Sequence, residues 1–176
     1  MLKCAGVAAV VLAAACVARP AVAQITLGSP GDPPHIAFGA GAFDVTPSAS
    51  NTHGGTAGEF RGEYRFGDVG WWFISPFLGV SGTSDGAFYG YGGFGFDINF
   101  TPNWVLTPNG AVGYFGRGSG TNLGSAVEFR TGAELDYRFA DLSRLGVAVH
   151  HTSNAGIGKH NPGEQSVVLM YSLPLR

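Results

Sequence analysis

Hydrophobic and polar residues alternate one by one along much of the chain. In residues 58–66 the charged side chains share one parity and the aromatic side chains share the other. The charged set is Glu59, Arg61, Glu63 and Arg65, and the aromatic set is Phe60, Tyr64 and Phe66. Consecutive side chains of a β-strand point to opposite faces, so this pattern predicts a strand with one charged and one aromatic face.

The same alternation, interrupted by turn residues, predicts about eight strands. They lie near residues 35–45, 58–66, 72–82, 86–100, 103–115, 124–139, 143–153 and 164–175. Strands of this length match the roughly 9–11 residues that a tilted membrane-spanning strand needs. An open sheet edge is prohibitive in lipid, so such strands must close. The pattern therefore predicts an all-β fold, an eight-stranded antiparallel transmembrane β-barrel of the outer-membrane type.

The distribution of charge decides which face of the strands would point inward. Mixed-sign charge on one face with aromatic residues on its back is typical of a polar barrel interior and a lipid-facing exterior. The alternative is a soluble β-sandwich or a periplasmic lipocalin-like barrel, in which the apolar face would point inward. The density of charge on one face and of aromatic rings on the other favours the membrane barrel.

The N-terminus reads as an export signal. A positive start at Lys3 is followed by an apolar run, and Ala21-Val22-Ala23 supplies the small residues that a signal peptidase accepts. We expect residues 1–23 to be a signal peptide and residues 24–176 to form a single barrel domain. The predicted location is the bacterial cell outer membrane.

Composition excludes several classes of function. Removal of Lys3 and Arg19 with the signal peptide leaves 8 basic and 12 acidic side chains, which argues against a nucleic-acid partner. Both cysteines, Cys4 and Cys16, fall in the removed segment. The histidines show no close metal-ligand spacing, so we expect no metal and no cofactor.

His151 and Ser153 are the residues whose arrangement suggests chemistry. They are two positions apart in a predicted strand, so their side chains leave the same face. Acyl transfer by serine needs a hydroxyl whose proton a nearby imidazole can take. Leu145, Val147 and Val149 share their parity, which places the pair on the outside of the barrel near its rim. A lipid, rather than a soluble molecule, would be the substrate there.

The surrounding residues carry a resemblance to a known family. The run His151-Thr152-Ser153-Asn154-Ala155-Gly156, then Asn161-Pro162-Gly163 and a closing strand, resembles the C-terminal signature of the outer-membrane lipid A 3-O-deacylases of the PagL (acyloxyacyl hydrolase) type. The resemblance implies a serine esterase that removes an ester-linked acyl chain from lipopolysaccharide without a cofactor.

The resemblance also implies roles for individual residues. Ser153 would be the nucleophile and His151 the general base. Asn161, with the backbone around Asn154 to Gly156, would hold the developing oxyanion.

The third member of the family's Ser–His–Glu triad departs from the pattern. Counted from Ser153, the family's glutamate position falls on Gln165, and Glu164 is one residue earlier. Parity turns Gln165 outward toward His151 and Glu164 inward. A Gln165 carbonyl would fix the histidine tautomer but would not stabilise an imidazolium as a carboxylate does. A one-residue bulge near Gly163 would instead rotate Glu164 onto the active face.

A second function remains open at this point. A non-catalytic outer-membrane barrel with a structural or adhesive role would keep the fold after losing the triad carboxylate. The sequence does not predict the oligomeric state.

Overall fold

The computed structural model describes residues 25–46, 55–70 and 73–176, so the predicted signal peptide lies outside the described residues. Eight long strands make up the body of the molecule. They are β2 (His35–Phe43), β3 (Ala57–Arg65), β4 (Ile74–Thr83), β5 (Phe88–Phe96), β7 (Trp104–Gly116), β8 (Val127–Arg138), β9 (Arg144–Ser153) and β10 (Glu164–Pro174). Two short strands, β1 (Thr26–Leu27) and β6 (Ile98–Asn99), pair with each other at one end.

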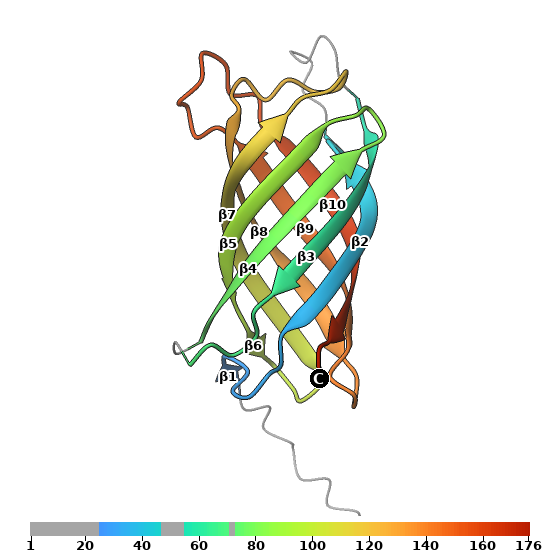
Figure 1. The fold of residues 1–176 in the computed structure, drawn as a ribbon, viewed down its shortest axis with the longest axis vertical. Helices are drawn as coiled ribbons and strands as arrows, with labels where there is room; N and C mark the ends of the chain where they lie inside the picture. The colour runs from blue at the N-terminus through green and yellow to red at the C-terminus, as the bar shows by residue number, and fades with distance from the viewer. Residues whose placement is uncertain (1–24, 47–54, 71–72) are drawn as a thin grey trace, which may run out of the picture.

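The long strands form one closed antiparallel ring in the order β2, β3, β4, β5, β7, β8, β9 and β10 (Figure 1). The ring closes where β10 pairs with β2, for example at Tyr171 and Phe38. This confirms the predicted eight-stranded barrel. Within the described residues, no helix is long and apolar enough to cross a membrane.

One predicted strand, 86–100, is divided in the structure. β5 ends at Phe96 and β6 begins at Ile98, with the buried residue Asp97 between them. The Asp97 carboxylate accepts hydrogen bonds from Ser29 Oγ at 2.6 Å and Thr107 Oγ1 at 2.8 Å. These partners hold Asp97 at the lower end of the interior, where the long strand is interrupted.

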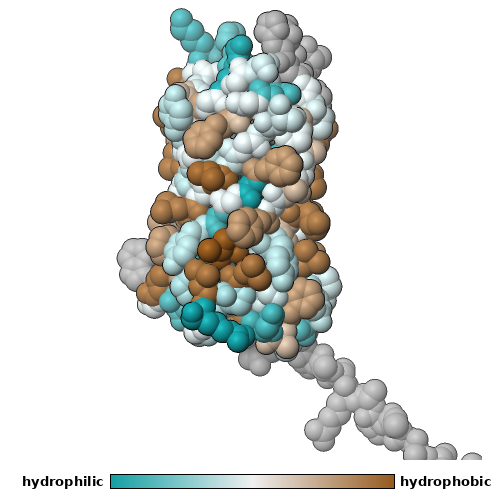
Figure 2. Space-filling view, turned by 45° about the vertical axis from the view of Figure 1, so that its right-hand side comes forward, coloured by the Kyte–Doolittle hydropathy of each residue, from teal (hydrophilic) through white to brown (hydrophobic). Residues whose placement is uncertain are grey.

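The outer face of the barrel is apolar and the inner face is charged, as the alternation predicts. Phe60 is 69% exposed, whereas its neighbours Glu59 and Arg61 are 2% and 6% exposed. Figure 2 shows hydrophobic side chains spread over the middle of the wall and hydrophilic ones mainly toward the two ends. This is the reverse of the arrangement expected for a soluble sandwich or a lipocalin-like barrel.

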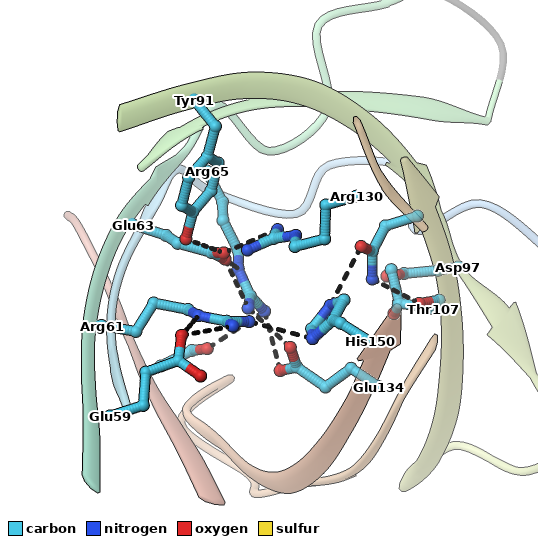
Figure 3. A network of polar contacts seen from close by, with 12 residues as sticks. Glu59, Arg61, Glu63, Arg65, Tyr91, Asp97, Thr107, Arg130, Glu134 and His150 are labelled. Atoms are coloured by element: carbon cyan, nitrogen blue, oxygen red, sulfur yellow. Dashed lines mark hydrogen bonds and ion pairs between the residues drawn. The ribbon is translucent and has the colours of Figure 1, made fainter. Parts of the chain in front are cut away.

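Ion pairs fill the middle of the interior (Figure 3). Glu63 lies at their centre, because its carboxylate contacts Arg65 at 2.9 Å and Arg130 at 3.1 Å and accepts the Tyr91 hydroxyl at 2.8 Å. Arg65 also pairs with Glu134 at 2.7 Å. Each of these four charged side chains, Glu63, Arg65, Arg130 and Glu134, thus has an opposite charge beside it, which offsets the cost of removing it from water.

His150 belongs to this interior network, because its side chain leaves the face of β9 opposite to that of His151. Arg61 Nη1 lies 3.0 Å from His150 Nδ1, and His150 Nε2 lies 3.1 Å from Asn109 Oδ1. Arginine can only donate, so Nδ1 accepts and the imidazole proton is on Nε2, which donates to Asn109. His150 is therefore a neutral structural histidine, turned away from the outer wall.

The two ends of the barrel are closed by different means. At the lower end Arg144 Nη2 contacts Asp32 at 2.6 Å and Asp97 at 2.8 Å, which ties the segment before β2 to the wall. Beside it, the N–H groups of Gly31 and Gly70 donate to Asp68 and hold the pKa of that carboxyl below its usual value.

Above the ion pairs, an apolar cluster fills the interior from the level of Tyr91 up to Leu123 beneath the loops. Its members are Phe43, Ala57, Phe77, Ala87, Tyr89, Tyr91, Phe115 and Leu123. The long loops after β7 and β9 lie at this same end in Figure 1. The interior thus has ion pairs in its middle and, under the loops, apolar side chains beside buried carboxylates such as Glu128 and Glu164.

We expect the Glu63→Ala substitution to lower the free energy of unfolding by about 3–5 kcal/mol, because it leaves Arg65 and Arg130 buried without their shared carboxylate. Urea unfolding of the barrel in lipid vesicles, followed by tryptophan fluorescence, measures this loss. The matched control is Phe60→Leu on the outer face of the same strand, which should cost less than about 1 kcal/mol. Equal losses in the two variants would contradict the central role of Glu63.

Candidate active site

His151 and Ser153 lie at the upper end of β9, on the outer face of the barrel. His151 is exposed, Ser153 is half-buried, and Thr152 between them is buried. Val149, the next outward residue along β9, is 51% exposed on the apolar wall. The structure thus places both side chains at the boundary between the lipid-facing wall and the loops.

The two side chains are neighbours on one strand face, about 7 Å apart at their Cα atoms. In the described part of the chain they make no direct hydrogen bond to each other. Such bonds are often long before substrate binds and shorten in the complex. The backbone therefore places Ser153 and His151 side by side, although their side chains are not joined by a hydrogen bond.

Gln165 lies directly opposite His151 on β10. Its Nε2 is 3.2 Å from His151 Nδ1, and the Thr46 hydroxyl donates to its Oε1. The contact with Nδ1 leaves the other ring nitrogen, Nε2, as the one available to Ser153. Gln165 is thus the side chain that contacts His151 Nδ1.

Glu164 points into the barrel. It is 1% exposed, pairs in register with Thr152, and accepts the backbone N–H of Asp44 at 3.3 Å. The register of β9 and β10 runs from Glu164 without interruption, so the bulge that would turn Glu164 outward is not present. Of the two residues considered from the sequence, Gln165 is the one that contacts His151.

Asn154 organises the loop that follows Ser153. It is fully buried, and its Nδ2 donates to the carbonyl oxygens of Leu123 at 2.7 Å and His160 at 2.6 Å. Its Oδ1 accepts the N–H of Gly156 at 2.9 Å. One side chain thus joins the β9–β10 loop to the β7–β8 loop.

Asn161, predicted to support an oxyanion, also lies in this loop. Its Oδ1 accepts the backbone N–H of Asn154 at 3.0 Å. The N–H groups of Asn154 and Gly156 therefore already have partners within the loop. An oxyanion at Ser153 would use Asn161 Nδ2, or would replace Asn161 Oδ1 at the Asn154 N–H.

Both the backbone conformation and the close packing at position 163 require a glycine. Its φ is +66°, and a Cβ placed there would lie 2.7 Å from His151 Cε1 and 3.4 Å from Nε2. Any side chain would therefore push against the imidazole ring. The glycine lets the loop pass beside His151 before β10 begins.

The β7–β8 loop is the part of the site that sequence reasoning missed. Leu123 is fully buried beneath the upper end, and Thr121 Oγ1 donates to Asp44 Oδ2 at 2.7 Å. Gly124 packs so closely on the His160 carbonyl that a Cβ would lie 2.1 Å from it. This loop holds Asn154 through the Leu123 carbonyl, although no pattern in residues 117–126 signals that role.

Two hollows in the structure are not lined by His151 or Ser153. An interior cavity of about 50 Å³ lies among the charged residues, far below the roughly 300–1,000 Å³ of typical small-molecule sites. An open apolar hollow of about 410 Å³ lies on the outer wall around Phe38, Gly62 and Leu78. Within the described residues, no group of three or more His, Cys, Asp or Glu side chains is placed to hold a metal ion.

Comparison with protein families identifies the chain. A model of the lipid A 3-O-deacylase (PagL) family matches residues 58–174. The chain belongs to this family. The match confirms the predicted resemblance and includes every candidate site residue except Thr46.

Solved structures support the PagL fold. The crystal structure of the outer membrane enzyme PagL matches with a TM-score of 0.58 at 20% sequence identity, over 80% of this chain and 99% of that one. A de novo designed transmembrane β-barrel matches with a TM-score of 0.57 at 11% identity, over 84% of this chain and 99% of that one. At these identities the likeness concerns the fold alone. No curated protein matches the sequence.

We expect Asn154→Asp to loosen the PagL-type loop, because a carboxylate cannot donate to the carbonyl oxygens of Leu123 and His160. Each lost buried hydrogen bond should cost about 1–3 kcal/mol. Hydrogen exchange at the Gly156 amide should become at least tenfold faster. The matched control is Asn122→Asp, since Asn122 only accepts the Gly124 N–H, which a carboxylate also does. Unchanged exchange in Asn154→Asp would show that Asn154 does not hold the loop.

Proposed function

We propose that the protein is a serine esterase that removes an ester-linked acyl chain from lipid A in the bacterial outer membrane. The observation that carries the proposal is the grouping of Ser153, His151 and Gln165 on the outer wall, at the rim of a barrel of the PagL family. The family's name supplies the substrate, lipid A, and the bond, a 3-O ester.

The position of the site supports a lipid substrate. The interior cavity is too small for an acyl chain, whereas the outer wall beside Val149 exposes apolar side chains against which an acyl chain would pack. Longer loops of outer-membrane barrels face the outside of the cell, which places this rim at the outer leaflet. Lipopolysaccharide would therefore reach Ser153 by lateral diffusion, with its acyl chains along the wall.

The chemistry assigned to the pair follows from their functional groups. Ser153 Oγ would attack the ester carbonyl carbon while its proton passes to His151 Nε2. The bond to the sugar oxygen breaks, and that oxygen takes the proton from His151. Water then adds to the acyl-enzyme by the same route, which releases a free fatty acid and restores Ser153.

Gln165 would make this reaction slower than a carboxylate would. A neutral amide can orient the imidazole but does not stabilise the imidazolium that forms when His151 takes the proton. The same substitution favours a second function, a non-catalytic barrel that retains the PagL fold. The two differ in whether Ser153 is ever acylated.

Expression in a bacterium without such an activity, followed by mass spectrometry of its lipid A, tests the esterase. We expect loss of one ester-linked acyl chain with the natural protein and no loss with Ser153→Ala. The matched control is Ser81→Ala on β4, which should retain the activity, since it lies on the opposite side of the ring. Unchanged lipid A, with the barrel folded in the outer membrane, would favour the non-catalytic function.

Glu164→Gln tests which residue supports His151. Because Glu164 faces the interior and Gln165 contacts the imidazole, we expect this variant to keep deacylation within about twofold of the natural protein. Initial rates on purified lipopolysaccharide in mixed micelles give the comparison, with the gel shift on heating as a check of folding. A loss of a hundredfold or more in a folded Glu164→Gln barrel would assign the supporting role to Glu164.

A further inference from the structure

The outer wall carries few polar side chains, and they are gathered in one place. On the eight long strands alternate residues face outward, and nearly all of these are glycine, aliphatic or aromatic. The non-aromatic polar residues that face outward on these strands are Thr131, His151, Ser153 and Gln165. They lie on the neighbouring strands β8, β9 and β10. Three of them form the proposed active site, and Thr131 is the fourth.

Thr131 lies directly beside the proposed catalytic pair. It pairs in register with His151, which in turn pairs with Gln165, so the three residues form a row across three strands. Phe129, the next outward residue on β8, pairs with Ser153. Thr131 is thus the diagonal neighbour of Ser153, at a typical distance of about 7–8 Å between Cα atoms. A molecule bound at Ser153 would lie within reach of the Thr131 hydroxyl.

The Thr131 hydroxyl is exposed, and no described residue forms a hydrogen bond with it. Apolar residues continue along β8 on both sides of it. Val127 and Phe129 lie toward the loops and Leu135 lies toward the lower end, and all three are exposed. The hydroxyl therefore lies within the apolar wall, where a polar group without a partner is unfavourable. A hydrogen-bonding group on a bound lipid would satisfy it.

The neighbouring positions leave space over Thr131. Gly110 on β7 pairs with Thr131, and a Cβ placed on Gly110 would have its nearest contact at 3.8 Å, with the Arg130 carbonyl oxygen. The next outward residue of β8 toward the lower end is Ala133, which is small and half-buried. At these two positions no large side chain covers the hydroxyl, so a lipid on the wall would contact it.

The geometry limits which part of a substrate meets Thr131. The sugar of a lipid would stay with the polar loops, and the ester carbonyl oxygen would turn toward Asn154 and Asn161 in the β9–β10 loop. Thr131 lies two residues further along β8 toward the lower end than Phe129, the partner of Ser153. It therefore faces the first carbons of the acyl chain. The simplest polar group that an acyl chain carries there, besides its carbonyl, is a hydroxyl.

We propose that Thr131 is a specificity-determining residue that binds a hydroxyl on the third carbon of the acyl chain, so that the protein prefers hydroxylated acyl esters. The inference rests on the proposed function, because Ser153 fixes the carbonyl end of the chain. A threonine hydroxyl both donates and accepts, so it pairs with a substituent hydroxyl in either sense. A hydroxyl near the methyl end of the chain lies far from Thr131 along the wall and gains nothing.

Kinetics on three synthetic sugar esters of equal chain length test this preference. One ester carries a hydroxyl on the third carbon of its acyl chain, one carries it near the methyl end, and one carries none. We expect the natural protein in mixed micelles to hydrolyse the first with a kcat/KM about 3- to 10-fold above that of the other two, which corresponds to one neutral hydrogen bond. Equal kcat/KM values for the three esters would overturn the recognition.

Thr131→Val removes the hydroxyl and keeps the shape of the side chain. We expect it to bring the ratio of kcat/KM between the first ester and the ester without a hydroxyl close to 1, whereas Thr131→Ser should preserve that ratio. The matched control is Thr26→Val, which should keep the natural ratio because Thr26 is exposed on β1 at the lower end. If a folded Thr131→Val barrel instead loses the same factor on all three esters, Thr131 does not recognise the hydroxyl.

Binding without turnover separates this inference from the proposed function. The Ser153→Ala barrel, labelled with ¹³C in its threonine methyl groups, is placed in lipid nanodiscs with either the ester hydroxylated on its third carbon or the ester without a hydroxyl, at the same mole fraction. We expect the Thr131 methyl signal to shift with the first ester and not with the second, and the Thr26 signal to shift with neither.

The two readouts have distinct failures. If the Thr131 signal shifts as expected but the natural protein hydrolyses none of the esters, the recognition stands and the esterase is wrong. If the natural protein hydrolyses the esters but the Thr131 signal shifts equally with both or with neither, the esterase stands and the recognition is wrong.

Discussion

Closure of the sheet is the constraint on which the rest of this structure depends. A membrane offers no water to an unpaired strand edge, so β10 must pair with β2 as every other strand pairs with its neighbours. Once the ring is closed, each strand has only an inner and an outer face. Every side chain is then assigned to the interior or the wall by its parity, and His151 and Ser153 come to lie outside with the apolar residues.

The closed ring also explains how charges are tolerated inside. Glu63, Arg65 and Arg130 are buried among partners that the neighbouring strands supply. These contacts occupy the space that a larger barrel would leave to solvent. The outer surface at the rim, where His151 and Ser153 lie, is left for the proposed chemistry on a lipid.

Much of the fold and part of the site were predictable because a strand repeats every two residues. Parity alone turns Gln165 outward and Glu164 inward, and the structure confirms both orientations. The same rule does not apply beyond the strands. Leu123 lies in a loop whose inward path depends on packing against residues from several strands, and Thr46 reaches Gln165 across 119 positions of sequence through the closure of the ring. The break at Asp97 was not predictable, because the side chains that bind its carboxylate lie in segments far away in the sequence.

The filled interior has a consequence for the permeability of the membrane. Ion pairs occupy the middle of the barrel, Leu123 and its aromatic neighbours cover the upper end, and Arg144 ties the segment before β2 across the lower end. In the part of the chain that the structure describes, these groups fill the barrel at three levels and obstruct the passage of a small solute or a hydrated ion. A cell could therefore hold many copies of this protein in its outer membrane without becoming leaky to antibiotics or detergents by that route.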